Sequence, residues 1–371
     1  MPARPPRVVI VGGGPAGAAT AIALAGHAIP ALVLERAAGP QRKPGECLSP
    51  GFKQLLGRLG LSRLLDSGAH RRFPGITSVW ERAEPVARDL LFEADGEGWL
   101  LDRTAFEAQL LEAARARGAI VRRGYRVEGV ARAGAGFRVT AAGERGAVEI
   151  AADLLVDATG RAAAIARTLG SRVRRLDGLV GTWGLLEPVG GDRATSAEGG
   201  PIHIEATREG WWYAARLSGG HLSVVRFADR ALLDPDEVMA ALRGTRHASA
   251  LLGERAFRLA RPPTIHPASS ARLTAPSGPG WFAVGDAAAA FDPLSSYGIG
   301  SALGTGFYAA QAIASAWAGD EAACDAYQAL IERRYQVYLD ALRERYRAVT
   351  RWPGAPFWRR RGGTAPGSGS G

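Results

Sequence analysis

The sequence predicts an α/β fold in which a parallel-sheet domain with a β-meander is joined to a second, mainly antiparallel-sheet domain. Val8–Val11 is a continuous β-branched run that ends in a glycine turn. A helical stretch at Ala16–Ala25 and a second apolar run at Ala31–Glu35 follow it. This strand, helix, strand order is typical of a parallel sheet that is covered on both faces. Between residues 179 and 265 the pattern changes to alternating runs, which indicate antiparallel strands.

Composition excludes several classes of protein. The 371 residues carry 46 Lys+Arg against 36 Asp+Glu, but only Lys43 and Lys53 are lysines and the arginines are scattered, so we expect no nucleic-acid partner. Cys47, Cys324 and the six histidines lack metal-ligand spacing, so we predict no metal and no disulfide. No apolar run reaches the ~18 residues of a membrane span. We therefore expect a cytoplasmic protein without stable membrane insertion.

Periodicity predicts the remaining elements. The predicted helices are residues 102–117, which begin at a capping Asp and stop at Gly118, Pro235–Leu252, and a long Ala-rich helix at Ile299–Ala318. Short alternating runs from Ala119 to Ile150 predict the meander, and Asp153–Val156 predicts the strand that follows it.

These elements predict a domain order in which two domains alternate along the chain. The dinucleotide-binding domain is expected at 1–75, 101–175 and 271–318, the substrate domain at 76–100 and 176–270, C-terminal helices at 319–352, and a disordered tail at 353–371.

The turn after the first strand carries the pattern GxGxxG between a strand and a helix. Gly12 permits the tight turn, Gly14 lets the backbone approach a diphosphate, and Gly17 allows close packing of helix on strand. The helix N-terminus adds N–H groups and a positive dipole. The predicted dinucleotide contacts in this region are Gly12, Gly14, Pro15, Ala16, Gly17, Glu35 and Arg36, with Glu35 on a ribose. This turn does not by itself distinguish FAD from NAD(P).

Two later segments favour FAD because they resemble segments of two-dinucleotide-binding-domain flavoproteins. Asp153–Arg161 resembles the strand and loop that follow the meander in those proteins, with Gly160 at the turn. Trp281–Ala288 resembles the strand that delivers Gly285 and Asp286, and the resemblance implies that this Asp binds a ribityl hydroxyl beside the diphosphate.

The next segment, Ala290–Gly300, leads into the long helix. Backbone N–H groups of Gly298, Ile299 and Gly300, together with the helix dipole, can stabilise negative charge at N1 and O2 of reduced flavin. The glycines let the backbone come close to the ring.

With these motifs the chain resembles the para-hydroxybenzoate hydroxylase superfamily, in the branch that contains flavin-dependent halogenases and geranylgeranyl-reductase-like proteins. Gly45–Pro50 resembles the GE-x-L-x-P loop beside the isoalloxazine, and Arg103 resembles an FAD-contacting arginine at a helix start. The sharpest match is Asp292–Ile299. The resemblance implies bound FAD and an electron supply from transient NAD(P)H or from a separate flavin reductase.

Departures from the family pattern bear on the reaction. In halogenases a Lys and a Glu deliver the halogenating species, but Ser295 stands at the Glu position, and residues 69–77 contain Arg71 and Arg72 but no lysine. Tyr297 stands where halogenases have the Thr of the halide site. Halogenation is therefore disfavoured.

The resemblance leaves oxygen insertion, in which a flavin C4a-hydroperoxide hydroxylates an aromatic substrate. The substrate is expected to be a small aromatic molecule or a Trp side chain in a partner protein, because the Asp292–Ser296 loop also resembles flavoproteins that mature tryptophan-derived quinone cofactors. Alternatives are an alkene reductase of the geranylgeranyl type, a halogenase, and a non-catalytic flavin-binding protein. The predicted catalytic residues are Glu46, Pro293, Tyr297 and Gly298, and candidates for the substrate wall are His203, Glu205, Trp211, Trp212, Tyr213 and Arg226. Cys47 is expected to be an inert packing residue.

Overall fold

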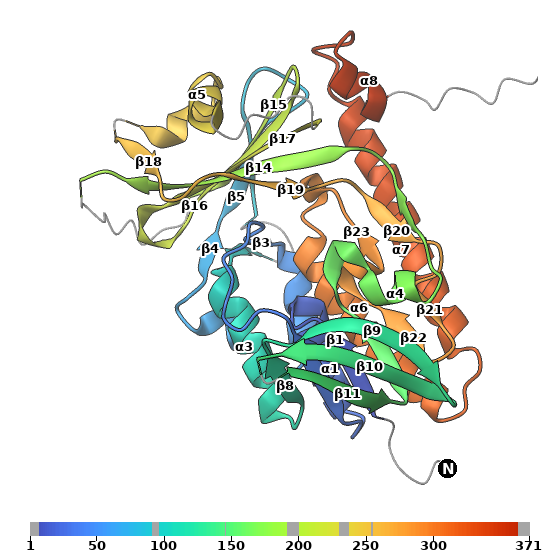
Figure 1. Cartoon of the computed structure of the whole chain (residues 1–371). Helices are drawn as coiled ribbons and strands as arrows, with labels where there is room; N and C mark the ends of the chain where they lie inside the picture. Colours follow the sequence, from blue (N-terminus) through green and yellow to red (C-terminus); the bar gives the residue numbers. More distant parts are fainter. Residues whose placement is uncertain are drawn as a thin grey trace, which may run out of the picture. The chain divides into compact units, whose positions relative to one another are not determined.

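A computed structural model describes residues 7–90, 96–144, 146–190, 200–229, 237–253 and 255–362 (Figure 1). The chain forms two compact units, each assembled from three chain segments. Unit 1 comprises Met1–Ala69, Leu101–Leu176 and Ser270–Tyr335, and unit 2 comprises His70–Leu100, Asp177–Ser269 and Gln336–Gly371. The mixed α/β class predicted from the sequence is confirmed, with a parallel Rossmann-like sheet in unit 1 and an antiparallel sheet in unit 2.

Unit 1 is built on a six-stranded sheet whose centre is β1 (Val8–Val11). β1 pairs in parallel with β2 (Ala31–Glu35) and with β12 (Leu154–Asp157), and all four of its residues are buried, as the unbroken β-branched run predicts. The sheet continues to β8 (Ile120–Arg123) on one side, and to β22 (Trp281–Ala283) and β21 (Ser277–Gly278) on the other.

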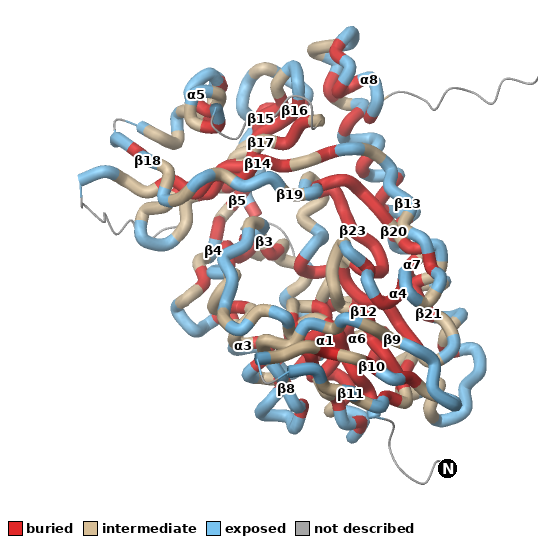
Figure 2. Tube along the Cα trace, in the orientation of Figure 1, coloured by how far each residue is buried: buried red, intermediate tan, exposed pale blue. Residues whose placement is uncertain are grey.

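The meander of unit 1 is shorter than the sequence predicts. It consists of β9 (Arg126–Ala133), β10 (Gly136–Gly143) and β11 (Gly146–Ala152) and shares a hydrophobic core with the parallel sheet. The first run assigned to it is instead β8, which pairs in parallel with β2. Figure 2 shows the central strands as buried and much of β11 as exposed. Period-two alternation alone does not distinguish a parallel edge strand from a meander strand.

Helices of unit 1 agree with the sequence pattern. α1 (Pro15–Ala25) packs along α6 (Gly298–Trp317), and α3 (Arg103–Ala116) also contacts α1. Asp102 caps α3 by accepting a hydrogen bond from Ala105 N at 2.9 Å. The shorter elements of the unit are β3 (Cys47–Leu48), α2 (Lys53–Arg58), α4 (Ala164–Thr168), β13 (Val173–Arg175), β20 (Ala271–Leu273) and β23 (Ala289–Ala290).

Unit 2 contains an eight-stranded sheet among its described residues. Its members are β18 (Phe257–Leu259), β14 (Leu179–Pro188), β17 (Leu222–Asp229), β16 (Gly210–Arg216), β15 (Ile202–Thr207), β5 (Gly75–Val79) and β6 (Val86–Asp89), with β19 (Thr264–Pro267) beside β14. All pairings are antiparallel except that of β15 with β5. Within the same unit β4 (Arg71–Phe73) pairs with β7 (Gly98–Leu100).

The helix predicted at Pro235–Leu252 is interrupted. The structure has α5 (Val238–Arg243) and a separate 3₁₀ turn at Ala248–Leu252, and residues 230–236 lie outside the described part of the chain. The buried Glu205 carboxylate accepts N–H bonds from Arg246, His247 and Ala248 at 2.6–3.0 Å. A side chain distant in sequence therefore caps the break.

The C-terminal segment also departs from the prediction, which placed a disordered tail from residue 353 onward. α7 (Ala323–Arg347) is followed by α8 (Pro356–Gly362), and Phe357, Trp358 and Arg361 of α8 are buried. The predicted tail from 363 to 371 lies outside the described residues. The Pro/Gly-rich composition concealed aromatic residues that can bury a large apolar area.

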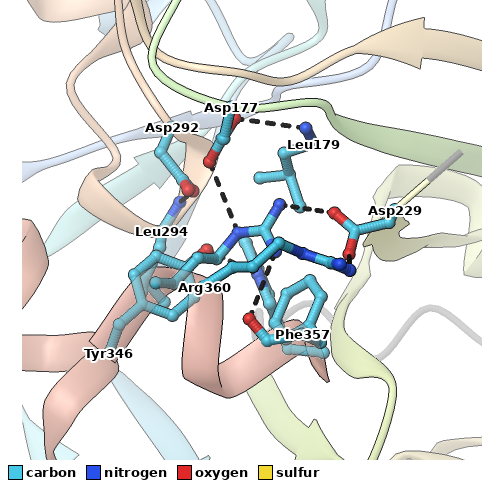
Figure 3. Close-up of polar contacts among 10 residues, drawn as sticks. Asp177, Leu179, Asp229, Asp292, Leu294, Tyr346, Phe357 and Arg360 are labelled. Carbon is cyan, nitrogen blue, oxygen red and sulfur yellow. Dashed lines mark hydrogen bonds and ion pairs between the residues drawn. The ribbon is translucent and has the colours of Figure 1, made fainter. Parts of the chain in front are cut away.

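Arg361 ties α8 to the rest of unit 2. Its side chain is only 4% exposed, forms ion pairs with Asp177 at 3.3 Å and Asp229 at 2.8 Å, and lies over the Phe357 ring at 4.0 Å (Figure 3). Arg360 also pairs with Asp229. Burial alone would raise the pKa of Asp229, but Arg361 and Arg360 hold it below its ordinary value.

We predict that Arg361→Ala lowers the free energy of unfolding by about 3 kcal/mol, because it removes a buried guanidinium and leaves two half-buried carboxylates without their main partner. Urea unfolding at neutral pH measures this loss. A carboxylate with a depressed pKa contributes stability that is present above its unfolded pKa, near 4, and is lost as the pH falls through its folded value. The loss of stability in acid should therefore be less steep in Arg361→Ala than in the wild-type protein.

The matched control is Arg258→Ala, which removes the exposed ion pair with Glu187 in the same unit. Its cost should be below ~1 kcal/mol. Equal losses in the two variants would show that burial of the Arg361 pairs contributes nothing.

Candidate functional site

The glycine turn after β1 is closely packed at two positions and open at a third. Gly12 has φ +111°, and a Cβ there would lie 2.2 Å from the carbonyl oxygen of Ala158. A Cβ on Gly17 would lie 2.0 Å from the oxygen of Gly12. A Cβ on Gly14 would meet no atom within 4 Å. The turn therefore leaves open backbone at Gly14, as close approach of a diphosphate requires.

Glu35 lies beside this turn at the end of β2. One oxygen of its carboxylate accepts a hydrogen bond from Gly13 N at 2.7 Å, and the other accepts one from Ala37 N at 2.8 Å. These bonds fix the carboxylate at the carboxyl edge of the parallel sheet and leave lone pairs for a ribose hydroxyl. The neighbouring Arg36 is exposed.

The Gly285–Asp286 turn comes from the far end of the sequence to the same place in unit 1. Gly285 has φ +58°, and a Cβ there would lie 2.8 Å from Cβ of Ala16 in the first turn of α1. Gly285 N donates to Thr305 Oγ1 of α6 at 2.7 Å. Two predicted motifs separated by about 270 residues in the chain thus lie side by side.

Asp286 faces a basic environment. Burial raises the pKa of Asp286, while the positive charges of Arg161 and Arg103 oppose that shift. Arg161 Nε lies 3.4 Å from the carboxylate, and its Nη2 donates to Phe291 O at 3.0 Å. Arg161 was not among the predicted site residues. The signal for it was its place directly after Gly160, whose φ of +67° forms the turn.

The segment before α6 holds its own conformation. Asp292 is fully buried, and its side chain accepts a hydrogen bond from Leu294 N at 2.9 Å. Its backbone oxygen accepts the Ser295 hydroxyl at 2.8 Å, and Ser296 takes the left-handed conformation with φ +54°. Pro293 begins the short 3₁₀ turn that links them.

The first N–H groups of α6 have no acceptor within the helix. Its first intrahelical hydrogen bond runs from Ser301 N to Tyr297 O at 2.7 Å, so Gly298, Ile299 and Gly300 have no acceptor within the helix. A Cβ on Gly298 would meet no atom within 4 Å. The start of α6 therefore offers N–H donors, with open backbone at Gly298, where the sequence predicts stabilisation of negative charge.

Tyr297 is held in place although its side chain is 42% exposed. Its ring makes edge contacts with Phe52 and with Phe291, each at a centroid distance of 6.1 Å. Phe52 is a second residue near the predicted site that sequence reasoning missed, because a lone Phe in a loop carries no pattern.

The loop at Gly45–Pro50 is anchored by Arg103. Arg103 Nη1 donates to the carbonyls of Pro44 and Gly45 at 3.0 and 2.9 Å, and its Nη2 pairs with Glu107 at 2.5 Å. Its Nε is buried without a hydrogen-bond partner among the described residues, so this guanidinium retains a donor for a ligand. Glu46 in this loop is only 3% exposed. Burial raises the pKa of Cys47 to about 12, which keeps the thiol neutral.

In unit 2 the six candidates for the substrate wall lie in different environments. Trp211 and Trp212 are core residues, Trp211 stacking on Phe227 at 4.0 Å, while Glu205 caps the turn described above. Arg226 pairs with Glu209 at 3.2 Å. The two remaining candidates, His203 and Tyr213, are half-buried.

Neither a metal site nor a membrane helix is found among the described residues. No group of three His, Cys, Asp or Glu side chains in that part of the chain could hold a metal ion. None of its helices combines the length and the apolar character needed to cross a bilayer.

Comparison with known proteins identifies the family. Residues 6–206 match the family model of the FAD binding domain. This chain is an FAD-binding flavoprotein of the para-hydroxybenzoate hydroxylase superfamily. The flavoprotein is 31% identical over 363 residues to the FAD-dependent oxidoreductase LodB of Marinomonas mediterranea, which covers 95% of this chain and 96% of that protein.

Two solved structures resemble the flavoprotein closely. The flavin-dependent halogenase CmlS is 26% identical with a TM-score of 0.84, over 98% of this chain and 68% of CmlS. The peptidyl tryptophan dihydroxylase QhpG is 25% identical with a TM-score of 0.77, over 96% of this chain and 79% of QhpG. The predicted superfamily, fold and FAD cofactor are thereby confirmed, and the chain belongs to a family of FAD-dependent oxidoreductases.

We predict that Gly14→Ala weakens FAD binding at least tenfold without loss of stability, because the added methyl meets no protein atom and enters only the space expected for the diphosphate. Fluorescence titration with FAD and urea unfolding measure the two quantities.

Gly39→Ala is the matched control, since a Cβ at Gly39 also meets nothing within 4 Å. It should leave FAD affinity unchanged. Unchanged affinity in Gly14→Ala would remove Gly14 from the binding site.

Proposed function

We propose that the flavoprotein is a monooxygenase that hydroxylates an aromatic substrate, with unit 1 as the FAD-binding domain and unit 2 as the substrate domain. Its electrons would come from NAD(P)H or from a separate flavin reductase. Bound FAD, once reduced, supplies the activation of molecular oxygen. The chain's own residues bind the cofactor, orient its ring and exclude water.

The cofactor-binding residues form two groups in this proposal. The diphosphate and ribose lie along the α1 turn beside Glu35, with Asp286 on the ribityl chain and the free Nε of Arg103 available as a donor. The predicted residues of this group are Gly12, Gly14, Pro15, Ala16, Gly17, Glu35, Arg36, Arg103, Gly160, Gly285 and Asp286. The N–H groups of Gly298, Ile299 and Gly300, which have no acceptor within the helix, stabilise negative charge on the reduced ring.

We favour oxygen insertion because this chain lacks the Lys and Glu that deliver the halogenating species in halogenases. Ser295 stands at the Glu position, and its hydroxyl is bonded to Asp292 O at 2.8 Å. Of the two lysines, Lys43 is paired with Glu107 at 2.7 Å and Lys53 is exposed on α2. Glu46, Pro293, Tyr297 and Gly298 are the residues we expect to border the reacting ring.

For the substrate we propose a tryptophan side chain carried by a partner protein. The support is QhpG, which is named as a peptidyl tryptophan dihydroxylase and resembles this chain over 96% of its length. A small free aromatic molecule is the other form that the substrate could take.

Halogenation is the second candidate, because the halogenase CmlS is as similar to this chain as QhpG is. The two reactions differ in what reaches the aromatic carbon, which is an oxygen atom in one and a halogen in the other. They therefore differ in their dependence on halide.

We predict that the FAD-loaded protein, reduced with dithionite and mixed with isotopically heavy oxygen and a Trp-containing peptide, yields a peptide that carries the heavy oxygen. Mass spectrometry with and without chloride or bromide measures the product. The yield should not depend on halide.

A halogenated peptide would establish the second candidate. Heavy oxygen recovered only as hydrogen peroxide, with the peptide and free aromatic amino acids all unchanged, would overturn hydroxylation of aromatic substrates. Such a result, together with stoichiometric reduction of an added prenyl alkene, would favour the reductase.

A further inference from the structure

Phe52 covers Gly300 at the start of α6. A Cβ on Gly300 would lie 2.3 Å from three ring carbons of Phe52, so the face of the ring rests directly on the glycine. Real Cβ atoms essentially never come this close to another heavy atom. Only glycine lets Phe52 take this position, and only an aromatic or similarly broad side chain fills it.

The ring also touches the residue on the other side of the N–H groups. Phe52 and Tyr297 make an edge contact with an interplanar angle of 86°. The three N–H groups without an acceptor in the helix belong to Gly298, Ile299 and Gly300, so Phe52 contacts both ends of this segment. One helical turn further along α6, Leu55 lies at an ordinary 3.5 Å from where a Cβ of Gly304 would stand.

A second contact joins the same two segments. The Ser296 side chain opposes the effect of burial on the pKa of the Cys47 thiol, so the loop containing Glu46 lies beside the residue before Tyr297. The chain from Cys47 to Leu55 is thus attached to the start of α6 through a polar contact and through an aromatic one.

We propose that Phe52 is a positioning residue. It sets the distance between the Gly298–Gly300 backbone and the flavin ring, and so tunes the reduction potential of bound FAD. This inference rests on the proposed placement of the ring against these N–H groups. It assigns Phe52 no contact with the substrate.

The physical argument concerns the charge of the reduced ring. Reduction places negative charge near N1 and O2 of the flavin. N–H donors held at a fixed distance from the ring stabilise that charge without reorganising. Loss of the Phe52 ring leaves a void on Gly300, and the segment can relax into it. Weaker donation then disfavours reduced FAD more than oxidised FAD, which lowers the potential.

We expect Phe52→Ala to lose about tenfold of its preference for reduced over oxidised FAD, which for a two-electron couple is a fall of about 30 mV. Phe52→Leu should lower the potential by less than Phe52→Ala does, since a branched side chain fills some of the space. Dye-equilibrated spectroscopic titration of the FAD-loaded protein measures the midpoint potential.

Leu55→Ala is the matched control because it truncates a side chain of α2 that contacts α6 at Gly304, one turn away from the N–H segment. It should lower stability but leave the potential unchanged. An equal shift in Leu55→Ala and Phe52→Ala would mean that general loosening of α2 causes the effect, and would overturn the proposal.

Gly300→Ala tests the contact from the opposite side. The added methyl collides with the ring in the wild-type background, and Phe52→Ala removes that collision. The two changes should therefore be non-additive, with the double variant binding FAD better than Gly300→Ala alone. Additive effects of the two changes on FAD binding would show that the contact between Phe52 and Gly300 is not the cause, and would overturn the proposal.

Failure of the proposed flavin placement is distinguishable from failure of this inference. If Gly298→Ala in the wild-type background changes neither FAD affinity nor potential, the ring does not lie on this segment and the placement itself fails. If Gly298→Ala has an effect and Phe52→Ala has none, only the role of Phe52 is overturned.

Discussion

Close backbone approach around the first turn of α1 is the constraint on which the rest of unit 1 depends. Gly17 lets α1 pack on the turn after β1, Gly285 lets the Asp286 turn reach Ala16, and a Cβ on Gly306 of α6 would lie 2.5 Å from Ala16 O. Three chain segments meet there, and a side chain at any of these glycines would separate them. The glycine turn before α1, the Asp286 turn and α6 are brought together by that packing.

The same packing determines where charge can be placed. α1 and α6 are both long enough to present a helix N-terminus. A glycine with open space beside it caps α1 (Gly14) and begins α6 (Gly298). One terminus suits the diphosphate and the other suits the reduced ring, which are the two places where an FAD-dependent enzyme carries negative charge. The positive charges of Arg161 and Arg103 oppose the effect of burial on the Asp286 carboxylate.

Much of unit 1 could be predicted because its signals are local. A β-branched run, a glycine turn and a helix lie within 20 residues at the N-terminus, and the Asp286 turn has the same compact form. What failed depends on distant partners. The predicted 235–252 helix is interrupted where the Glu205 carboxylate caps residues 246–248. Part of the predicted tail forms α8, in which Arg361 pairs with Asp177 and Asp229.

The candidate site shows the same division between local and distant signals. Gly14 and Asp286 follow from motifs, and the structure brings their turns together. Phe52 was missed because its role depends on a glycine about 250 positions away that has no pattern in common with it. Trp211 and Trp212 were candidates for the substrate wall because they lie on a predicted strand of the second domain. Both are core residues, since a large aromatic in a strand stabilises a sheet wherever it is buried.

The segment before α6 shows how an exposed loop can act as a fixed part of a site. The Asp292 side chain and backbone oxygen accept hydrogen bonds from Leu294 N and the Ser295 hydroxyl, so contacts within the loop support its conformation. Its single exposed aromatic, Tyr297, is held between Phe291 and Phe52. Only the N–H groups that follow it lack an acceptor within the helix. Donors that are already oriented lose little entropy when charge develops beside them, and a loop of this kind is therefore suited to a reaction in which the charge appears and disappears on each turnover.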